Sequence, residues 1–191
     1  MPTCLITGAN RGIGLEFARQ YLADGWHVIA TCRHPEKAEA LRSLTGNIEI
    51  HALDVLEFAR IDNFAKSFAP IGIDLLINNA GVYGPRIVTY DMIDYDSWLE
   101  VFRVNVMAPL KISAAFSRHV ARSEKRLIAS LSSTMVSIAD NTSGSAYIYR
   151  TSKAALNAAM RSLAMGRKIT ATSMSVRARS HHKTPRELGC L

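Results

Sequence analysis

Residues 7–14 read Thr7-Gly8-Ala9-Asn10-Arg11-Gly12-Ile13-Gly14, directly after the short apolar run Cys4-Leu5-Ile6. The apolar run is typical of a buried strand, and a helical pattern of apolar residues begins at Leu15. Glycines at such a turn let backbone amides approach a pyrophosphate at the start of the helix. The turn therefore predicts a dinucleotide site, with a plain turn as the alternative. The candidate cofactor-binding residues are Gly8, Asn10, Arg11, Gly12, Ile13 and Gly14.

Short apolar runs and helical patterns alternate along the chain after this turn. Strands are expected at 4–6, 27–31, 48–53, 74–77 and 126–131, and helices at 15–22, 35–41, 55–68, 98–120 and 147–165. Asp96 or Ser97 is the expected cap of the helix at 98–120. Continuous apolar strands with helical crossovers predict an α/β fold, a doubly wound parallel sheet of the Rossmann type with helices on both faces. In such sheets ligands bind beyond the carboxyl ends of the strands.

The length of 191 residues fits one domain, and a hydrophobic content of 48% argues against global disorder. No apolar run approaches the roughly 20 residues of a membrane span, and the N-terminus lacks the pattern of a signal peptide. Three scattered cysteines, Cys4, Cys32 and Cys190, form neither a metal motif nor a disulfide framework. We therefore expect a cytoplasmic protein with no membrane partner and no metal site.

The net charge of +7 is concentrated near the C-terminus. Residues 166–191 contain one acidic residue, Glu187, and six basic ones, which are Arg167, Lys168, Arg177, Arg179, Lys183 and Arg186. No aromatic residue is interleaved with these charges and no nucleic-acid motif is present, so we expect a solvated tail that binds no nucleic acid. The expected organisation is a dinucleotide-binding domain at 1–165 and a poorly ordered tail at 166–191. The β-branched residues of Ile169–Val176 leave a further strand open as the alternative.

The end of the second expected strand reads Thr31-Cys32-Arg33. A site selective for NAD usually has an acidic residue there to hold the ribose hydroxyls. Here Arg33 follows Cys32, and Arg11 lies in the glycine turn. Two guanidinium groups near the adenosine ribose favour a 2′-phosphate. The pattern predicts NADP as the preferred cofactor over NAD, with two ordinary surface arginines as the alternative.

Two further strand ends carry candidate cofactor residues. Asp54, which precedes Val55, either hydrogen-bonds the adenine or caps the third helix, and the sequence leaves both readings open. The fourth strand ends in Asn78-Asn79-Ala80-Gly81, where small residues leave room for a flat ring and a ribose. A plain turn is the alternative, since Asn and Gly are common turn residues.

Tyr149 and Lys153 lie four residues apart on an expected helix and therefore share one face. A cationic amine beside a phenol favours the phenolate, so the pair predicts a lowered pKa of Tyr149 and an acid–base group usable near neutrality. A surface helix pair is the alternative. Ser133 ends the fifth strand, where its hydroxyl is placed for a substrate carbonyl. Asn105 lies in the long helix, where Asn has poor propensity, and is expected to reach Lys153 through water.

Together these residues resemble the short-chain dehydrogenase/reductase family. The resemblance runs from about Pro2 to Met165 and rests on Thr7-Gly8-x-x-x-Gly12-x-Gly14, Asn78-Asn79-Ala80-Gly81, Asn105, Ser133 and Tyr149-x-x-x-Lys153. The segment Ser137–Gly144 is similar to the subgroup of C-factor, or cell–cell signalling, proteins. The spacing from serine to tyrosine is longer than the commonest one, and Ser133 is preferred over Ser132 for its place at the strand end.

The resemblance implies a role for each of these residues. Tyr149 would donate a proton to a carbonyl, and Lys153 would hold the nicotinamide ribose and tune Tyr149. Ser133 would polarise the carbonyl, while Asn105 would support a water-linked proton path. The family also implies a small-molecule carbonyl or alcohol substrate. It further implies a homodimer or homotetramer formed through the long helices.

The resemblance ends after Met165. No Pro-Gly pair follows, so the C-terminal strands are expected to be missing or altered. The segment that usually selects the substrate lies in this region, and the sequence therefore does not identify the substrate. Two hypotheses result. The first is an NADP(H)-dependent carbonyl reductase or alcohol dehydrogenase, supported by the complete Asn-Ser-Tyr-Lys set. The second is a catalytically impaired cofactor-binding or signalling protein, supported by the altered C-terminus.

Overall fold

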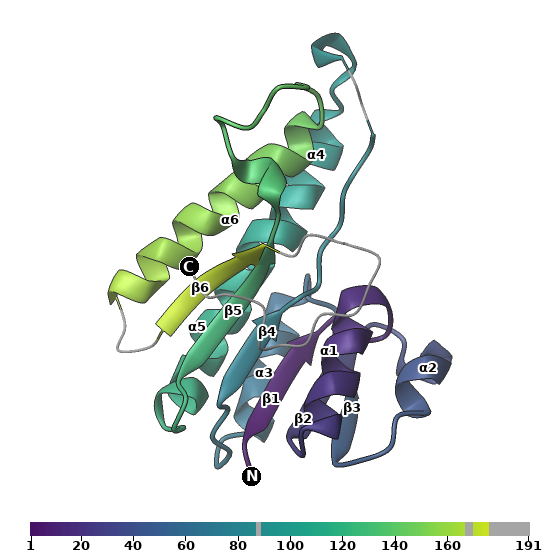
Figure 1. The fold of residues 1–191 in the computed structure, drawn as a ribbon, viewed down its shortest axis with the longest axis vertical. Coiled ribbons are helices and arrows are strands. Elements are labelled where there is room, and N and C mark those ends of the chain that lie inside the picture. The colour runs from purple at the N-terminus through teal and green to yellow at the C-terminus, as the bar shows by residue number, and fades with distance from the viewer. Residues whose placement is uncertain (87–88, 167–169, 176–191) are drawn as a thin grey trace.

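A computed structural model describes residues 1–86, 89–166 and 170–175. Within these residues six parallel strands form one sheet in the order β3-β2-β1-β4-β5-β6 (Figure 1). The strands are β1 (Thr3–Thr7), β2 (His27–Cys32), β3 (Ile48–Ala52), β4 (Leu75–Asn78), β5 (Leu127–Ser132) and β6 (Thr170–Ser175). The order reverses between β1 and β4, as in a doubly wound sheet. The predicted fold class is confirmed.

Helices cover both faces of the sheet. They are α1 (Gly12–Ala23), α2 (Glu39–Arg42), α3 (Phe58–Ser67), α4 (Tyr95–Phe102), α5 (Ala108–Ala121) and α6 (Tyr147–Gly166). One buried cluster joins the sheet to Ile61 of α3, Phe116 of α5 and Leu156 of α6. A second cluster joins it to Phe17 of α1 and Leu41 of α2. None of the described helices is long and apolar enough to cross a membrane.

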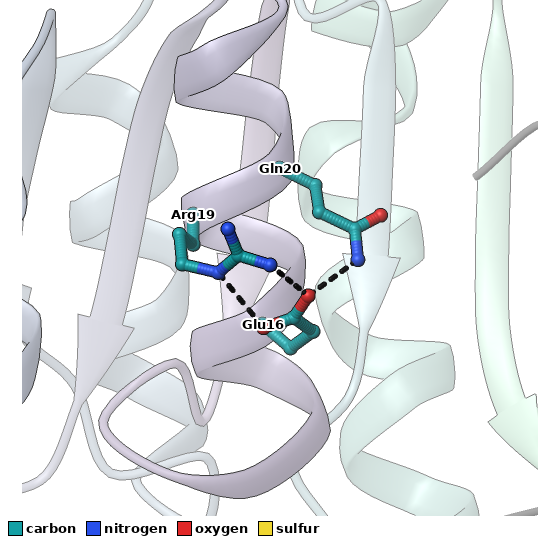
Figure 2. Close-up of polar contacts among 3 residues, drawn as sticks. All are labelled: Glu16, Arg19 and Gln20. Atoms are coloured by element: carbon teal, nitrogen blue, oxygen red, sulfur yellow. Dashed lines mark hydrogen bonds and ion pairs between the residues drawn. The ribbon is translucent and has the colours of Figure 1, made fainter. Parts of the chain in front are cut away.

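Helix α1 begins inside the glycine turn and is amphipathic. Its buried side packs Phe17 against the sheet, while Glu16, Arg19 and Gln20 form a polar cluster on the other side (Figure 2). Arg19 Nε donates to Glu16 Oε2 at 3.0 Å, and Gln20 Nε2 donates to Glu16 Oε1. Spacings of three and four residues bring side chains together on a helix surface, so these contacts support the helix that begins in the glycine turn.

The expected long helix at 98–120 begins earlier and is interrupted. Helix α4 starts at Tyr95, and a π-helical turn at Arg103–Met107 separates it from α5. Asp94 is the N-cap, since its carboxylate accepts from the backbone amides of Asp96 at 3.0 Å and Ser97 at 3.3 Å. The prediction of Asp96 or Ser97 as the cap is therefore wrong. The helix begins earlier than expected, and the carboxylate of Asp94 already accepts from the free backbone amides of its first turn.

Two other expected helices are shorter than the pattern indicates. The stretch at 35–41 divides into a 3₁₀ turn, Pro35–Lys37, and α2, because Ala38 between them has a non-helical ψ of 58°. The stretch at 55–68 forms only α3, which begins at Phe58. Apolar spacing locates both helices but not their first turns, which depend on local backbone geometry.

Strand β6 lies within the segment that was expected to be a tail. Thr170–Ser175 pair in parallel with Leu127–Ser132, and the Thr170 amide donates to the Arg126 carbonyl at 3.0 Å. For these six residues the alternative of a further strand holds, because a backbone ladder requires no particular side chains. The domain boundary expected after Met165 thus falls ahead of a paired strand. Residues 176–191 lie outside the described residues, and for them the tail stays a prediction.

A proline pair tests the register of β6. The Thr170 amide points to β5, so the Thr172 amide does too, whereas the Ser173 amide points away. Thr172→Pro should lower the free energy of unfolding by about 1–3 kcal/mol more than Ser173→Pro, because it leaves a β5 carbonyl without its donor. Urea denaturation of both variants measures the difference. Equal losses would contradict the register.

Candidate active site

The glycine turn lies at the carboxyl end of β1 and has a backbone that side chains would disturb. Gly8 has φ +65° and Gly12 has φ +57°, values that favour glycine. A Cβ atom at Gly14 would lie 2.4 Å from Asn79 Nδ2 and 2.5 Å from the Gly8 carbonyl oxygen. A Cβ atom at Gly12 would meet nothing within 4 Å. The turn is therefore packed tightly on one side and open at Gly12, as a phosphate cradle requires.

Asn79 fastens this turn to the end of β4. Its Nδ2 donates to the carbonyls of Thr7 at 2.9 Å and Gly8 at 2.8 Å. The backbone amides of Asn79 and Ala80 both donate to Thr7 Oγ1 at 3.1 Å. The strand end that was predicted to leave room for a ring therefore also holds the glycine turn in place.

Two arginines, Arg11 in the glycine turn and Arg33 directly after β2, present exposed guanidinium groups. The side chains of Arg11 and Arg33 are exposed, and neither forms a hydrogen bond or ion pair with the described residues. Cys32 is 3% exposed, and burial raises the pKa of its thiol, so it contributes no negative charge at neutral pH. This arrangement leaves both guanidinium groups available for an anion.

Asp54 closes a turn rather than capping a helix. Its Oδ1 accepts from the Leu56 amide at 2.9 Å, and α3 begins later, after an N-cap at Glu57 whose side chain makes no capping bond. The capping alternative for Asp54 is therefore wrong, since its carboxylate satisfies a turn amide ahead of the helix. Val55 packs into the core. The contact of Asp54 with an adenine stays a prediction.

Asn105 lies in the π-helical turn and is fully buried. Its Nδ2 donates to the Val82 carbonyl at 2.8 Å and to Ser152 Oγ at 3.0 Å, while its Oδ1 accepts from the Val82 amide at 2.9 Å. The wider turn thus lets one side chain join the segment after β4 to α6. Both amide hydrogens are used, so a water link through this side chain has only one Oδ1 lone pair left. Such π turns often occur at functional sites.

Ser133 follows directly after β5 and faces Tyr149 of α6. Its Oγ accepts from the Met135 amide at 3.2 Å. Burial raises the pKa of Tyr149, a hydrogen bond with Ser133 lowers it in part, and the nearby Tyr83 phenol raises it again. The neighbouring Ser132 hydroxyl is buried with no partner among the described residues. The geometry therefore brings Ser133, rather than Ser132, to Tyr149.

The prediction that Lys153 lowers the pKa of Tyr149 is wrong for this structure. Lys153 Nζ donates to the Leu131 carbonyl at 2.7 Å and lies 5.9 Å from the centroid of the Tyr149 ring. Burial lowers the pKa of Lys153 itself to about 8. The amine is thus held by a strand carbonyl, and desolvation decides the pKa of both groups.

Gly81 keeps the space between Lys153 and Asn105 free. A Cβ atom there would lie 3.2 Å from Asn105 Oδ1 and 3.6 Å from Lys153 Nζ. The predicted residues from five separate segments, which are the glycine turn, residues 79–81, Asn105, Ser133 and Tyr149 with Lys153, thus gather near the carboxyl ends of β1, β4 and β5. A cavity of about 630 Å³ lies elsewhere, between α3 and α5, and no predicted site residue lines it. Among the described residues no group of His, Cys, Asp and Glu side chains is arranged to hold a metal ion.

Comparison with known families agrees with this arrangement. The sequence model described as short chain dehydrogenase matches residues 2–178. The chain belongs to this family. The match includes the glycine turn, Asn105, Ser133, Tyr149 and Lys153, and it continues through β6.

Several short-chain dehydrogenases are similar to this chain. A carbonyl reductase from Pseudomonas aeruginosa PAO1, in complex with NADP, is 33% identical with a TM-score of 0.80 and covers 88% of this chain and 77% of its own. Carbonyl reductase Sniffer of D. melanogaster is 30% identical with a TM-score of 0.82, covering 92% and 80%. The C-signal of Myxococcus xanthus is 41% identical over 100 residues, which are 52% of this chain and 60% of that protein.

The match covers only part of the length of these curated relatives, 60% of C-signal and 59% of protein FixR of Bradyrhizobium diazoefficiens. The similarity to C-signal matches the subgroup that the sequence resembles. Sequence reasoning did not single out Tyr83, whose ring stacks on that of Tyr149 at a centroid distance of 4.5 Å. The signal available was its place two residues beyond Asn79-Ala80-Gly81.

Lys153→Met tests the cost of burying the amine. Burial lowers the pKa of Lys153 from 10.5 to about 8, so the charged amine costs the folded chain roughly 3 kcal/mol relative to the neutral amine. Between these pH values the unfolded chain keeps a proton that the folded chain releases. The free energy of unfolding of the wild type should therefore rise with pH across this window, and the Met variant should lack the rise.

Urea denaturation of both chains at pH 7, 8.5 and 10 measures this effect. Lys66→Met, which removes an exposed lysine of α3, is the matched control and should keep the wild-type rise. Losing the bond to Leu131 shifts the Met variant by a constant amount at every pH. A difference between wild type and Lys153→Met that does not change with pH would contradict the assignment.

Proposed function

We propose that this chain is an NADP(H)-dependent oxidoreductase that reduces a small carbonyl compound to an alcohol, or catalyses the reverse oxidation, with Tyr149 as the acid–base group. The observation that carries the proposal is the meeting of Tyr149, Ser133 and Lys153 at the sheet edge that also bears the glycine turn. In doubly wound sheets this edge is where ligands bind.

The residues at this edge fit an NADP molecule. The open space at Gly12 and the free amides at the start of α1 suit a pyrophosphate, and Arg11 and Arg33 suit a 2′-phosphate. Asp54 and Val55 are proposed to contact the adenine, while Asn79, Ala80 and Gly81 leave room for the nicotinamide ribose, which Lys153 is proposed to hold. When bound, the nicotinamide supplies or accepts the hydride. The similar Pseudomonas aeruginosa carbonyl reductase contains NADP, which supports the choice.

Tyr149 is protonated at neutral pH, so its Oη can donate a hydrogen bond to a carbonyl oxygen. Burial raises the pKa of this phenol and makes it a weaker acid in the absence of cofactor and substrate. Ser133 Oγ donates a hydrogen bond to the same oxygen and orients it. Asn105 holds the segment around Val82, and Lys153 stays fixed by the Leu131 carbonyl. These groups bind, orient and protonate the substrate.

We also propose a homodimer or homotetramer in the cytoplasm. Support comes from apolar side chains that stay exposed on α4, the π-helical turn, α5 and α6, which are Tyr95, Leu99, Met107, Leu110, Tyr147 and Met165. A surface of this kind on adjacent helices suits association with a second copy. Cys4 and Cys32 are both unpaired, in keeping with a reducing compartment.

Turnover of NADPH with a panel of aldehydes and ketones, measured beside NADPH binding, tests the proposed function. Binding together with substrate-dependent oxidation of NADPH is the expected result. Binding without turnover across the panel would instead favour the second hypothesis, a cofactor-binding or signalling protein. The similarity to C-signal is the observation that keeps this second function in view.

Arg33→Ala tests the cofactor preference. The variant should weaken NADPH binding by roughly 10- to 100-fold, the effect of losing a charge-assisted hydrogen bond, and should change NADH binding by less than about twofold. Fluorescence titration with both cofactors measures the two affinities. Arg42→Ala, an exposed arginine of α2, is the control and should leave both unchanged. Equal losses for the two cofactors with Arg33→Ala would refute a 2′-phosphate contact.

Tyr149→Phe tests the proton donor. Removing the hydroxyl should lower turnover by roughly 10²–10⁴-fold, the usual contribution of a general acid, while the ring packing and the affinity for NADPH remain. Steady-state kinetics and NADPH titration give the two readouts. A variant that keeps more than about a tenth of wild-type turnover would contradict the mechanism.

A further inference from the structure

Tyr83 takes part in a row of contacts that ends at the proposed proton donor. Its ring stacks on that of Tyr149 with centroids 4.5 Å apart and an interplanar angle of 21°. Arg86 Cζ lies 5.7 Å from the centroid of the Tyr83 ring, and Lys153 Nζ lies 5.9 Å from that of Tyr149. Two stacked phenols are thus each contacted by a cation, an arrangement that favours a fixed ring geometry.

The backbone on both sides of Tyr83 is fixed. Before it, the amide and the carbonyl of Val82 are both bonded to the Asn105 side chain, at 2.9 Å and 2.8 Å. After it, Gly84 has φ +78°, and a Cβ atom there would lie 2.7 Å from Val101 Cγ2 of α4. Both the backbone conformation and the space at position 84 therefore favour glycine. Tyr83 lies between Val82, which Asn105 holds, and this glycine position.

Lys153, Ser133 and Tyr83 contact Tyr149 in different ways. Lys153 Nζ lies 5.9 Å from the centroid of the Tyr149 ring, but its hydrogen bond goes to the Leu131 carbonyl. Ser133 forms a hydrogen bond with the Tyr149 hydroxyl, and in the proposed reaction the same hydroxyl must also bind the substrate carbonyl. Among the described residues, Tyr83 supplies the aromatic ring that stacks on Tyr149. Tyr83 itself is 41% exposed and gains little from burial of its own, which points to a role towards its neighbour.

We propose that Tyr83 is a positioning residue for Tyr149, holding the ring of the proton donor by stacking while Asn105, through Val82, holds the segment that carries Tyr83. The proposal rests on the proposed function, in which Tyr149 donates the proton. It assigns a further task to the amide of Asn105, which acts on Tyr149 through Val82 and Tyr83. Burial is the largest cause of the raised pKa of Tyr149, and the nearby Tyr83 phenol adds to it.

Three variants separate stacking from bulk. Tyr83→Phe keeps the ring and loses the hydroxyl, whereas Tyr83→Leu keeps an apolar side chain and loses the stack. Tyr83→Leu should lower kcat by roughly tenfold or more, since small displacements of a reacting group are costly, with NADPH affinity unchanged. Tyr83→Phe should stay within about threefold of wild type. Tyr90→Ala is the control, an exposed tyrosine on the same connection with no ring contact among the described residues. Equal losses in Leu and Phe overturn the proposal.

The pKa of Tyr149 gives a readout that needs no substrate. The chain has six tyrosines, and in ¹³Cζ-tyrosine NMR the Tyr149 resonance is the one missing from Tyr149→Phe. Its pKa should fall in Tyr83→Phe, which removes the like charge, and fall further in Tyr83→Leu, which also exposes the ring. In the kinetics the decline of reduction at high pH should move to lower pH in the same order. If the wild type shows no turnover, the proposed function fails, and the NMR titration alone then tests whether Tyr83 stacks on Tyr149. A Tyr149 pKa that is unchanged in Tyr83→Leu overturns the proposed role of Tyr83.

Discussion

The buried amide of Asn105 is the constraint on which the arrangement of the site depends. Its three hydrogen bonds reach the segment after β4 and the start of α6, which are far apart in the sequence. The bonds are made in the interior, where an unpaired amide is costly, so the two segments cannot separate without a large loss of free energy. The π-helical turn is what directs this side chain inward. Together these features hold Tyr83, Tyr149 and Lys153 in one region.

The same interior sets the chemistry through desolvation. Burial moves the pKa of Tyr149 upward and that of Lys153 downward to about 8, so desolvation shifts both groups towards their neutral forms while Lys153 stays mainly charged at pH 7. Adjacency on a helix face suggested an ion–phenol pair, and the Leu131 carbonyl prevents it by binding the amine. Burying Lys153 lowers the stability of the fold, and such a loss is common at functional sites, where a side chain must be held in one position.

The sheet and the gathering of the site follow from features that sequence records well. Alternating apolar runs and the glycines at 8, 12 and 14 predict the strand order reversal and the cradle beside it. Asp94 as a cap, the π turn at Asn105 and the turn at Asp54 were not predictable, because each depends on which of several nearby polar groups satisfies a backbone amide. Tyr83 was missed because stacking depends on three-dimensional approach. For Asn79 and Gly14 the sequence predicts the turns but not the contact between them. The structure adds that a Cβ atom at Gly14 would lie 2.4 Å from Asn79 Nδ2, which explains why glycine is needed there.

Strand β6 has a broader consequence. Its residues, Thr170–Ser175, are mostly small and polar, yet they continue the parallel ladder across all six positions of β5. The ladder is built from peptide groups, which every sequence except proline provides. The ladder thus tolerates small polar side chains in β6, although the neighbouring strand β5 ends just before Ser133 and carries the Leu131 carbonyl that binds Lys153. A change of side chain in β6 can therefore reach these residues through the position of the β5 backbone to which it is bonded.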